Sequence, residues 1–476
     1  MAKEKMEIKE RKDIPKEYTW DLESMYKSVE EWEKDLTDVL FKAEELEKYK
    51  GKVGESSKTL LQVLKDMEEV YRKADNVYTY SHMKLDEDTT VSASQAIFDK
   101  AMAAYVKVKE KTSFIIPEIL EIDEKTIERF FNEEEGLSLY KQYLDNILRK
   151  KEHILSSDME NILAQVGEIA SAPENIYSML TDADMKFPTI KDEKGNDVEI
   201  THANFIPLLE SKNRDVRKAA FDGLYTTYES FKNTLAQTLN ANIKANIFNA
   251  RVRKYNSALE ASLDENNIPV SVYENLIKAI HNNLDSMYKY MEIRKRALGV
   301  EELHMYDLYT PIVKDVDFDI PYEECKEIII KGLQPLKDEY LNVVKEGFES
   351  RWIDVYENKG KRSGAYSSGS YDSKPFILTS YHNTLDSAFT VAHEMGHSVH
   401  SYFTRKNQPF IYGNYSIFLA EVASTCNEAL LINYMLNNVK NENEKLYLLN
   451  HYLEQFRTTV YRQTMFAEFE KTIYEH

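Results

Sequence analysis

The feature that most constrains the fold of this chain is a helical pattern of apolar residues with few interruptions. Leu60, Leu64, Met67 and Tyr71, for example, recur at the spacing of three and four residues that places them on one face of a helix. Only 14 glycines and 11 prolines punctuate the 476 residues, which favours long helices with short connections. Hydrophobic residues make up 42% of the chain, enough for a folded core. The sequence therefore predicts a mostly α protein.

One departure from this pattern lies around residues 187–200. A polar, glycine-containing run at 191–197 separates two short apolar stretches, and this predicts a β-hairpin. The same region is the expected boundary between an N-terminal helical domain, 1–185, and a catalytic domain, 186–476.

A second departure comes later in the chain. Residues 352–356 and 375–381 each read as a β-strand, and the loop between them carries three glycines, Gly360, Gly364 and Gly369. A small β-sheet is therefore expected directly before the segment that begins at Asn383.

That segment contains the sequence His-Glu-Met-Gly-His at residues 393–397. On a helix, residues i and i+4 share one face, so His393 and His397 can hold one metal ion. Glu394 lies beside the first ligand, where it would act as general base on a zinc-bound water. This arrangement is typical of zinc-dependent peptide hydrolases.

The residues around the motif support a helix that runs through it. Asn383 or Thr384 can cap the helix, and Asp386 lies in its first turn. Gly396 costs about 1 kcal/mol against alanine inside a helix. Close approach of another backbone, or of substrate, would explain why a glycine stands there.

A catalytic zinc usually has three protein ligands, so a further ligand is expected. The metzincin extension is absent, because its two positions hold His400 and Phe403. A carboxylate on the helix predicted around 418–431 is the remaining common solution. Glu421 and Glu428 are seven residues apart on one face of that helix, and either could reach the metal. Glu428 could instead orient a ligating histidine or form an ion pair, and His400 is a further candidate for an outer contact.

The strand at 375–381 could also contribute to substrate binding. An edge strand beside the metal can pair with the main chain of an extended peptide, which predicts broad tolerance of substrate sequence. The alternative is a core strand with a covered edge. The candidate substrate contacts are Phe376, Leu378, Ser380 and His382.

Three stretches of the chain resemble the M3 family of metallopeptidases, and within it the oligoendopeptidases. They are the run from Ser363-Gly364-Ala365-Tyr366 through the 393–397 motif to Glu421-Val422-Ala423-Ser424-Thr425, the N-terminal residues 14–23, and residues 80–88. The resemblance covers the whole chain. It implies a mostly helical shell with a deep substrate channel, in which a single zinc ion is bound by His393, His397 and Glu421 and Glu394 is the catalytic glutamate.

The same resemblance implies an endopeptidase that cuts internal bonds of short oligopeptides. Family members continue beyond the point that corresponds to residues 466–470, with a His- and Tyr-rich segment that would donate hydrogen bonds to the substrate oxyanion. This chain ends at His476, so a C-terminally truncated catalytic domain is expected. Two other readings stay open, namely a zinc carboxypeptidase on a similar helical scaffold and a peptide-binding protein that does not cleave.

The net charge and the cysteine content limit the binding partners and the cellular location that the sequence predicts. Acidic residues outnumber basic ones by 81 to 61, and a net charge of −20 disfavours binding to nucleic acid or to anionic membranes. The two cysteines, Cys325 and Cys426, have no metal or redox spacing, which favours reduced thiols and a cytoplasmic location. No run of eighteen apolar residues and no apolar signal segment are found. The sequence leaves the oligomeric state open.

Overall fold

The computed structural model describes residues 8–313 and 318–475, and the chain forms two compact units. Unit 1 combines Met1–Lys151 with Asp317–Asn438, and unit 2 combines Glu152–Val316 with Val439–His476. The boundary expected between residues 185 and 186 therefore falls inside unit 2. Each unit joins segments that are distant in the sequence, and apolar spacing along the chain does not reveal such a pairing.

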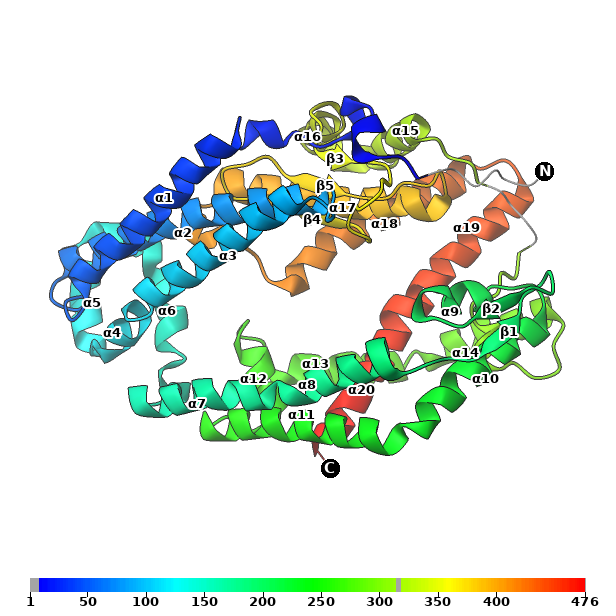
Figure 1. The fold of residues 1–476 in the computed structure, drawn as a ribbon, viewed down its shortest axis with the longest axis horizontal. Helices are drawn as coiled ribbons and strands as arrows, with labels where there is room; N and C mark the ends of the chain where they lie inside the picture. Colours follow the sequence, from blue (N-terminus) through cyan, green and yellow to red (C-terminus); the bar gives the residue numbers. More distant parts are fainter. Residues whose placement is uncertain (1–7, 314–317, 476) are drawn as a thin grey trace. The chain divides into compact units, whose positions relative to one another are not determined.

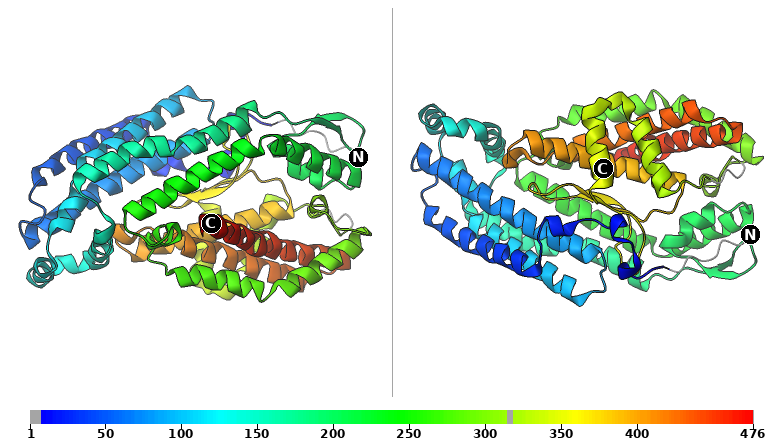
Figure 2. Two further views of the ribbon diagram at one scale, coloured as in Figure 1. Left: turned by 90° about the horizontal axis from the view of Figure 1, so that it is seen from below. Right: turned by 90° about the horizontal axis from the view of Figure 1, so that it is seen from above.

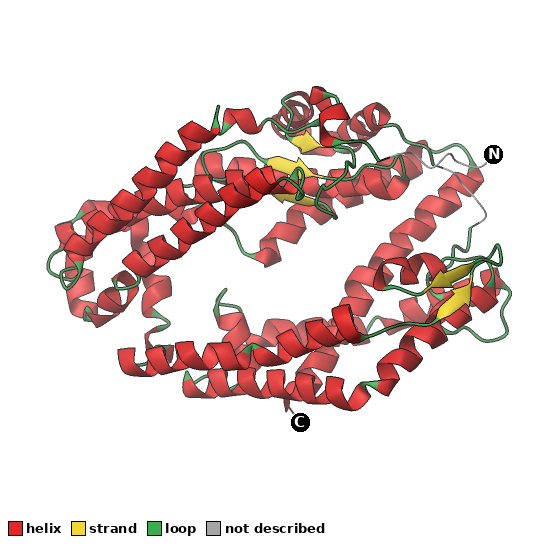
Figure 3. Cartoon of the chain, in the orientation of Figure 1, coloured by secondary structure: helices red, strands yellow, loops and turns green. Residues whose placement is uncertain are grey.

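Helices dominate both units, as the apolar pattern predicts (Figure 3). Within the described ranges, every helix is too short or too polar to cross a lipid bilayer. The helices of unit 1 are α1 (Val29–Glu45), α2 (Ser57–Asp86), α3 (Ser92–Thr112), α4 (Ile115–Glu121), α5 (Glu124–Glu133), α6 (Lys141–Leu148), α15 (Tyr322–Gly332), α16 (Lys337–Glu349), α17 (Leu385–Asn407) and α18 (Ile417–Asn438). Those of unit 2 are α7 (Ser157–Ala170), α8 (Ala172–Ser178), α9 (His202–Leu209), α10 (Arg214–Ser230), α11 (Lys232–Val252), α12 (Ala258–Asp264), α13 (Val270–His281), α14 (Leu284–Leu298), α19 (Glu442–Gln455) and α20 (Arg462–Glu475).

Helices α1, α2 and α3 lie side by side in unit 1 (Figures 1 and 2). The periodic face of α2 is buried as predicted, with Leu60, Leu64 and Met67 in the protein interior. Trp32 of α1 is fully buried against α2, where its Nε1–H donates a hydrogen bond to the carbonyl of Val77 over 2.9 Å. This layer forms one face of the core that supports the sheet of unit 1.

That sheet has the strand order β3-β5-β4, from β3 (Ile353–Asp354), β5 (Phe376–Leu378) and β4 (Tyr366–Ser368). Strand β5 pairs with β3 in parallel and with β4 in antiparallel fashion. The expected strands at 352–356 and 375–381 are thus present, whereas β4 forms within the segment that the sequence suggested was a loop. Its three residues are polar or aromatic, and glycines flank it, which conceals a strand from pattern analysis.

The prediction that 375–381 forms a substrate-binding edge is wrong. Strand β5 is central, and both Phe376 and Leu378 are 0% exposed. They pack into the core with side chains such as Trp20 and Tyr80, so they are not substrate contacts. A continuous apolar run is typical of a strand that is covered on both faces, and the Phe-Ile-Leu sequence of β5 fits that description.

In unit 2, the hairpin expected around 187–200 is confirmed. Strand β1 (Thr189–Lys191) pairs in antiparallel fashion with β2 (Asp197–Glu199). The turn is closed by the side chain of Asp192, whose Oδ1 accepts hydrogen bonds from the backbone N–H groups of Lys194 and Asn196, each over 2.8 Å.

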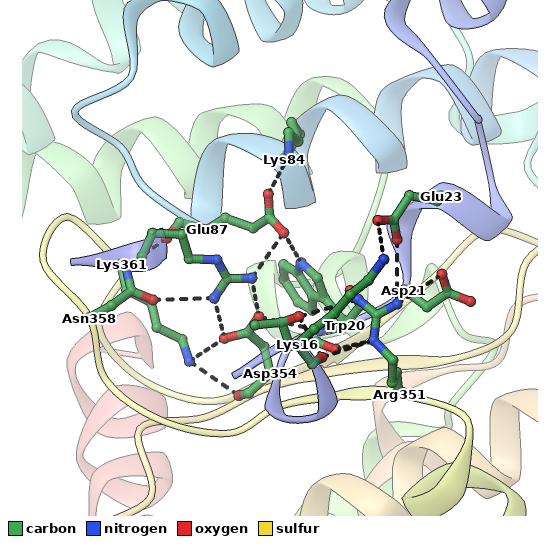
Figure 4. A network of polar contacts seen from close by, with 12 residues as sticks. Lys16, Trp20, Asp21, Glu23, Lys84, Glu87, Arg351, Asp354, Asn358 and Lys361 are labelled. Atoms are coloured by element: carbon green, nitrogen blue, oxygen red, sulfur yellow. Dashed lines mark hydrogen bonds and ion pairs between the residues drawn. The ribbon is translucent and has the colours of Figure 1, made fainter. Parts of the chain in front are cut away.

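A buried network of charges ties the N-terminal segment of unit 1 to β3 (Figure 4). The side chains of Asp354 and Lys361 are both 0% exposed, and Oδ1 of Asp354 lies 2.6 Å from Nζ of Lys361. The same oxygen accepts a hydrogen bond from Nη1 of Arg11 over 2.8 Å. Burial alone would raise the pKa of Asp354, but the charges of Lys361 and Arg11 outweigh it and lower that pKa. The carboxylate is therefore ionised at neutral pH and balances two cations.

Replacing Asp354 by alanine is expected to lower the free energy of unfolding of unit 1 by about 3–5 kcal/mol, because Lys361 would keep a buried charge without a counter-ion. Urea unfolding followed by tryptophan fluorescence measures this change. The signal reports on unit 1 because all three tryptophans are buried there, namely Trp20, Trp32 and Trp352.

A matched control is the Glu10→Gln variant. Glu10 belongs to the same N-terminal segment, but its ion pair with Lys359 is solvent-exposed, with side chains 49% and 56% accessible. Such pairs contribute about 1 kcal/mol or less. Equal destabilisation by the two substitutions would contradict a special role for the buried network.

Candidate active site

Helix α17 carries the His-Glu-Met-Gly-His motif at its middle, as expected. The Oγ1 atom of its N-cap residue, Thr384, accepts a hydrogen bond from the backbone N–H of Ser387 over 3.1 Å. Asn383 precedes it with φ of 58°, a left-handed conformation that asparagine tolerates better than most residues. Of the two expected caps, Thr384 is therefore the one used, and Asn383 makes the turn into the helix.

Gly396 explains how the next helix reaches the motif. A Cβ atom at this position would lie 2.7 Å from Cα of Ser424 and 2.8 Å from the carbonyl oxygen of Ala423, both in α18. The expected close approach is thus that of another backbone. Because α18 packs directly on α17 (Figure 1), acidic side chains of α18 lie next to the two histidines.

Three side chains converge on one point. The Nε2 atoms of His393 and His397 are 3.2 Å apart, and Oε2 of Glu421 lies 3.4 Å from the first and 3.7 Å from the second. Two ligand atoms at about 2.1 Å from a tetrahedral zinc ion are about 3.4 Å apart. The three separations and the mixture of nitrogen and oxygen donors therefore fit one zinc ion. Among the described residues, this is the group of side chains whose ligand atoms lie close enough together to hold a metal.

Glu428 lies on the other side of His393. Nδ1 of His393 donates a hydrogen bond to Oε1 of Glu428 over 2.5 Å, which leaves Nε2 turned toward His397 and Glu421. Burial lowers the pKa of His393, but the hydrogen bond and charge of Glu428 raise it by a larger amount, so the net shift of the pKa is upward. A carboxylate in this place can fix the ring orientation of a histidine, which is one of the roles that the sequence left open for Glu428, beside those of a metal ligand and of an ion-pair partner.

Glu394 is buried beside the cluster, with 7% of its surface exposed. Its carboxylate accepts a hydrogen bond from the backbone N–H of Ser367 in β4, and the Ser367 Oγ lies 2.8 Å from Oγ of Ser398 in α17. Burial raises the pKa of Glu394 to about 7; the charge of His393 opposes this shift and that of Glu421 adds to it. A carboxylate with a pKa near neutrality is suited to take up and release a proton.

The remaining candidates lie outside this group. His400 stacks on Tyr415, with ring centroids 3.7 Å apart, so its ring is held by an aromatic contact. Tyr415 itself was not foreseen; its hydroxyl lies 2.7 Å from Oγ of Ser401. Ser380 is partly buried, and His382 is exposed with Nε2 at 3.9 Å from the carboxylate of Glu357. His382 therefore faces a surface carboxylate.

The chain is similar to proteins of known family. The model of peptidase family M3 matches residues 207–476, and a model described as oligopeptidase F matches residues 118–187. Oligopeptidase PepF of Bacillus subtilis (strain 168) is 49% identical over 476 residues, which cover 100% of this chain and 71% of that protein.

Two crystal structures are also similar. A protein from Chlamydophila abortus aligns with a TM-score of 0.88 at 34% identity, over 98% of this chain and 79% of the other. Oligoendopeptidase-F from Enterococcus faecium aligns with a TM-score of 0.68 at 38% identity, over 94% of this chain and 75% of the other. On these matches, the chain belongs to peptidase family M3.

Proposed function

We propose that this protein is a zinc-dependent endopeptidase that hydrolyses internal bonds of short oligopeptides. The observation that carries the proposal is the convergence of His393, His397 and Glu421 at separations suited to one ion, with the buried carboxylate of Glu394 beside them. Membership of family M3, whose members are zinc-dependent metallopeptidases in general, supports it. One zinc ion per chain is proposed.

The roles follow from the positions of the side chains. A zinc ion held by His393, His397 and Glu421 would supply a Lewis acid that polarises a carbonyl group and makes water more acidic. Glu394 takes the proton of the attacking water and later gives it to the leaving amine. Glu428 holds Nδ1 of His393 and so keeps the ring in place.

Strand β4 is proposed as the substrate-binding strand, in place of residues 375–381. Within the described sheet, β4 pairs on one side with β5 and lies at the edge. The N–H of Ser367 points to Glu394, and in a strand the carbonyl of the same residue faces the same side. That carbonyl is therefore placed to accept a hydrogen bond from the main chain of a peptide, which is recognition by strand addition.

An end-blocked peptide tests the function. The zinc-loaded protein is incubated with an N-acetylated, C-amidated oligopeptide, and the products are identified by mass spectrometry. Internal cuts are expected, and a zinc chelator should suppress them. Loss of residues only from the free carboxyl end of an unblocked peptide would favour the carboxypeptidase alternative. Tight binding without cleavage of either peptide would favour the non-cleaving alternative.

A further inference from the structure

Unit 1 also contains a cavity of about 360 Å³ away from the metal-binding side chains. Its walls come from α2, α3, α4, α6, the C-terminal end of α17 and the segments around residues 369–371 and 410–414. The volume lies in the range of small-molecule sites, about 300–1,000 Å³. The residues assigned to zinc binding and catalysis do not line it.

Two opposite charges face this cavity without forming an ion pair with each other in the described structure. Nη2 of Arg405 donates a hydrogen bond to the carbonyl of Gly369 over 2.7 Å, but its Nη1 is buried and has no hydrogen-bond partner among the described residues. Asp75 accepts one long hydrogen bond, 3.4 Å, from the backbone N–H of Tyr371. Burial raises the pKa of Asp75 and lowers that of Arg405, so both charged groups lack part of the solvation that water would give.

Gly369 packs closely against the guanidinium of Arg405. A Cβ atom at position 369 would lie 2.8 Å from Nη1 of Arg405, so a side chain there would clash with the unpartnered donor. A buried charged donor without an acceptor costs free energy, and a ligand carboxylate or carbonyl would remove that cost.

The other walls are mainly apolar or already paired. Met67, Ile115, Ile116 and Phe410 supply aliphatic and aromatic surface. The hydroxyl of Tyr71 lies 2.8 Å from Oγ1 of Thr112. The carboxylate of Glu68 accepts a hydrogen bond from the Tyr140 hydroxyl over 2.7 Å. The groups most in need of a polar partner are therefore Arg405 and Asp75.

We propose that this cavity binds a small zwitterion of the α-amino-acid class with an apolar side chain, either a free amino acid or a dipeptide. The ligand carboxylate pairs with the guanidinium of Arg405, the ammonium group with Asp75, and the side chain packs on the apolar wall. A simple anion would be repelled by the negative charges of Asp75 and Glu68, and a simple cation would be repelled by the positive charge of Arg405. A zwitterion satisfies both charges, and this binding site goes beyond the proposed peptidase activity.

Isothermal titration of the full zinc-loaded chain tests the proposal with ligands that differ by one group. L-Phenylalanine is expected to bind once per chain. 3-Phenylpropanoate, which lacks the ammonium group, and phenethylamine, which lacks the carboxylate, should each bind about tenfold more weakly or worse, since each loses one charged hydrogen bond. Leucylphenylalanine, titrated into the Glu394→Gln variant to prevent hydrolysis, distinguishes a dipeptide site from an amino-acid site. Absence of binding by both zwitterions, or binding of either analogue as tight as that of phenylalanine, would overturn the proposal.

Variants locate the site. Asp75→Asn and Arg405→Gln should each weaken phenylalanine binding about tenfold. Lys65→Gln is the matched control, because Lys65 also lies on α2 but is exposed and does not line the cavity, and it should leave binding unchanged. Tryptophan fluorescence checks folding, and the near-isosteric Asp75→Asn variant decides the question if Arg405→Gln does not fold. Unchanged binding in folded variants would reject this location. Because no turnover is measured, the result is independent of the end-blocked peptide test.

Discussion

Replacing Glu394 by glutamine is expected to lower peptide turnover by about two to four orders of magnitude, the usual contribution of general acid–base catalysis. Glutamine has nearly the same shape, and its amide oxygen can still accept the hydrogen bond from the Ser367 N–H. It cannot take up the proton of the attacking water, because the amide is not basic at neutral pH. The measurement is the initial rate of cleavage of the end-blocked peptide, with zinc content determined on the same sample.

Zinc content should stay near one ion per chain in this variant, because Glu394 is not among the three side chains whose ligand atoms converge. The Asp386→Asn variant is the control. Asp386 is an acidic residue of the same helix, but it is exposed in the first turn, and turnover should be unchanged. A Glu394→Gln enzyme that retains both zinc and full turnover would rule out the proposed role.

Parts of this site that depend on local sequence could be predicted. The spacing of His393 and His397 requires only a helix, and the cap at Thr384 lies within one helical turn of the start of α17. Gly396 is also informative, because a glycine inside a helix points to close packing. The structure shows that the backbone of α18 is what packs there.

Parts that depend on tertiary contacts could not be predicted. Glu421 and Glu428 are seven positions apart, so helical periodicity places both on one face of α18. Only the way in which α18 docks on α17 gives the two carboxylates different contacts. In the structure Glu421 lies near both Nε2 atoms, whereas Glu428 contacts Nδ1 of His393. Strand β4 was missed for a related reason, since it exists because β5 pairs with it. Its short polar sequence has little strand signal of its own.

Three expectations stay predictions. The first is the cytoplasmic location, which was inferred from the two cysteines. The second is the lack of nucleic-acid or membrane partners, which was inferred from the net charge. The third is the tolerance of many peptide sequences, which follows if the substrate is bound through its main chain. Peptides as substrates are consistent with the oligopeptidase named among the relatives. Cleavage of end-blocked peptides that differ in length and sequence would measure which of them this chain prefers.

Replacing Glu421 by alanine is expected to remove zinc from the protein, and turnover with it. The variant keeps the two imidazoles but loses the anionic ligand, whose Oε2 lies 3.4 and 3.7 Å from their Nε2 atoms. A catalytic zinc with two protein ligands falls short of the usual three. Zinc per chain, measured by elemental analysis after dialysis against a weak chelator, should fall from about one to near zero.

The Glu428→Gln variant distinguishes a residue that binds the metal from one that only orients a metal ligand. Its carboxylate contacts Nδ1 of His393 rather than the point where the ligand atoms converge, and loss of such an outer contact costs about 10–100-fold in metal affinity or activity. Zinc should therefore remain measurable in Glu428→Gln under conditions that strip it from Glu421→Ala. If the order were reversed, with zinc lost from Glu428→Gln and kept in Glu421→Ala, then Glu428 would be the third ligand. His393 would then have to turn its ring so that Nδ1 faced the metal.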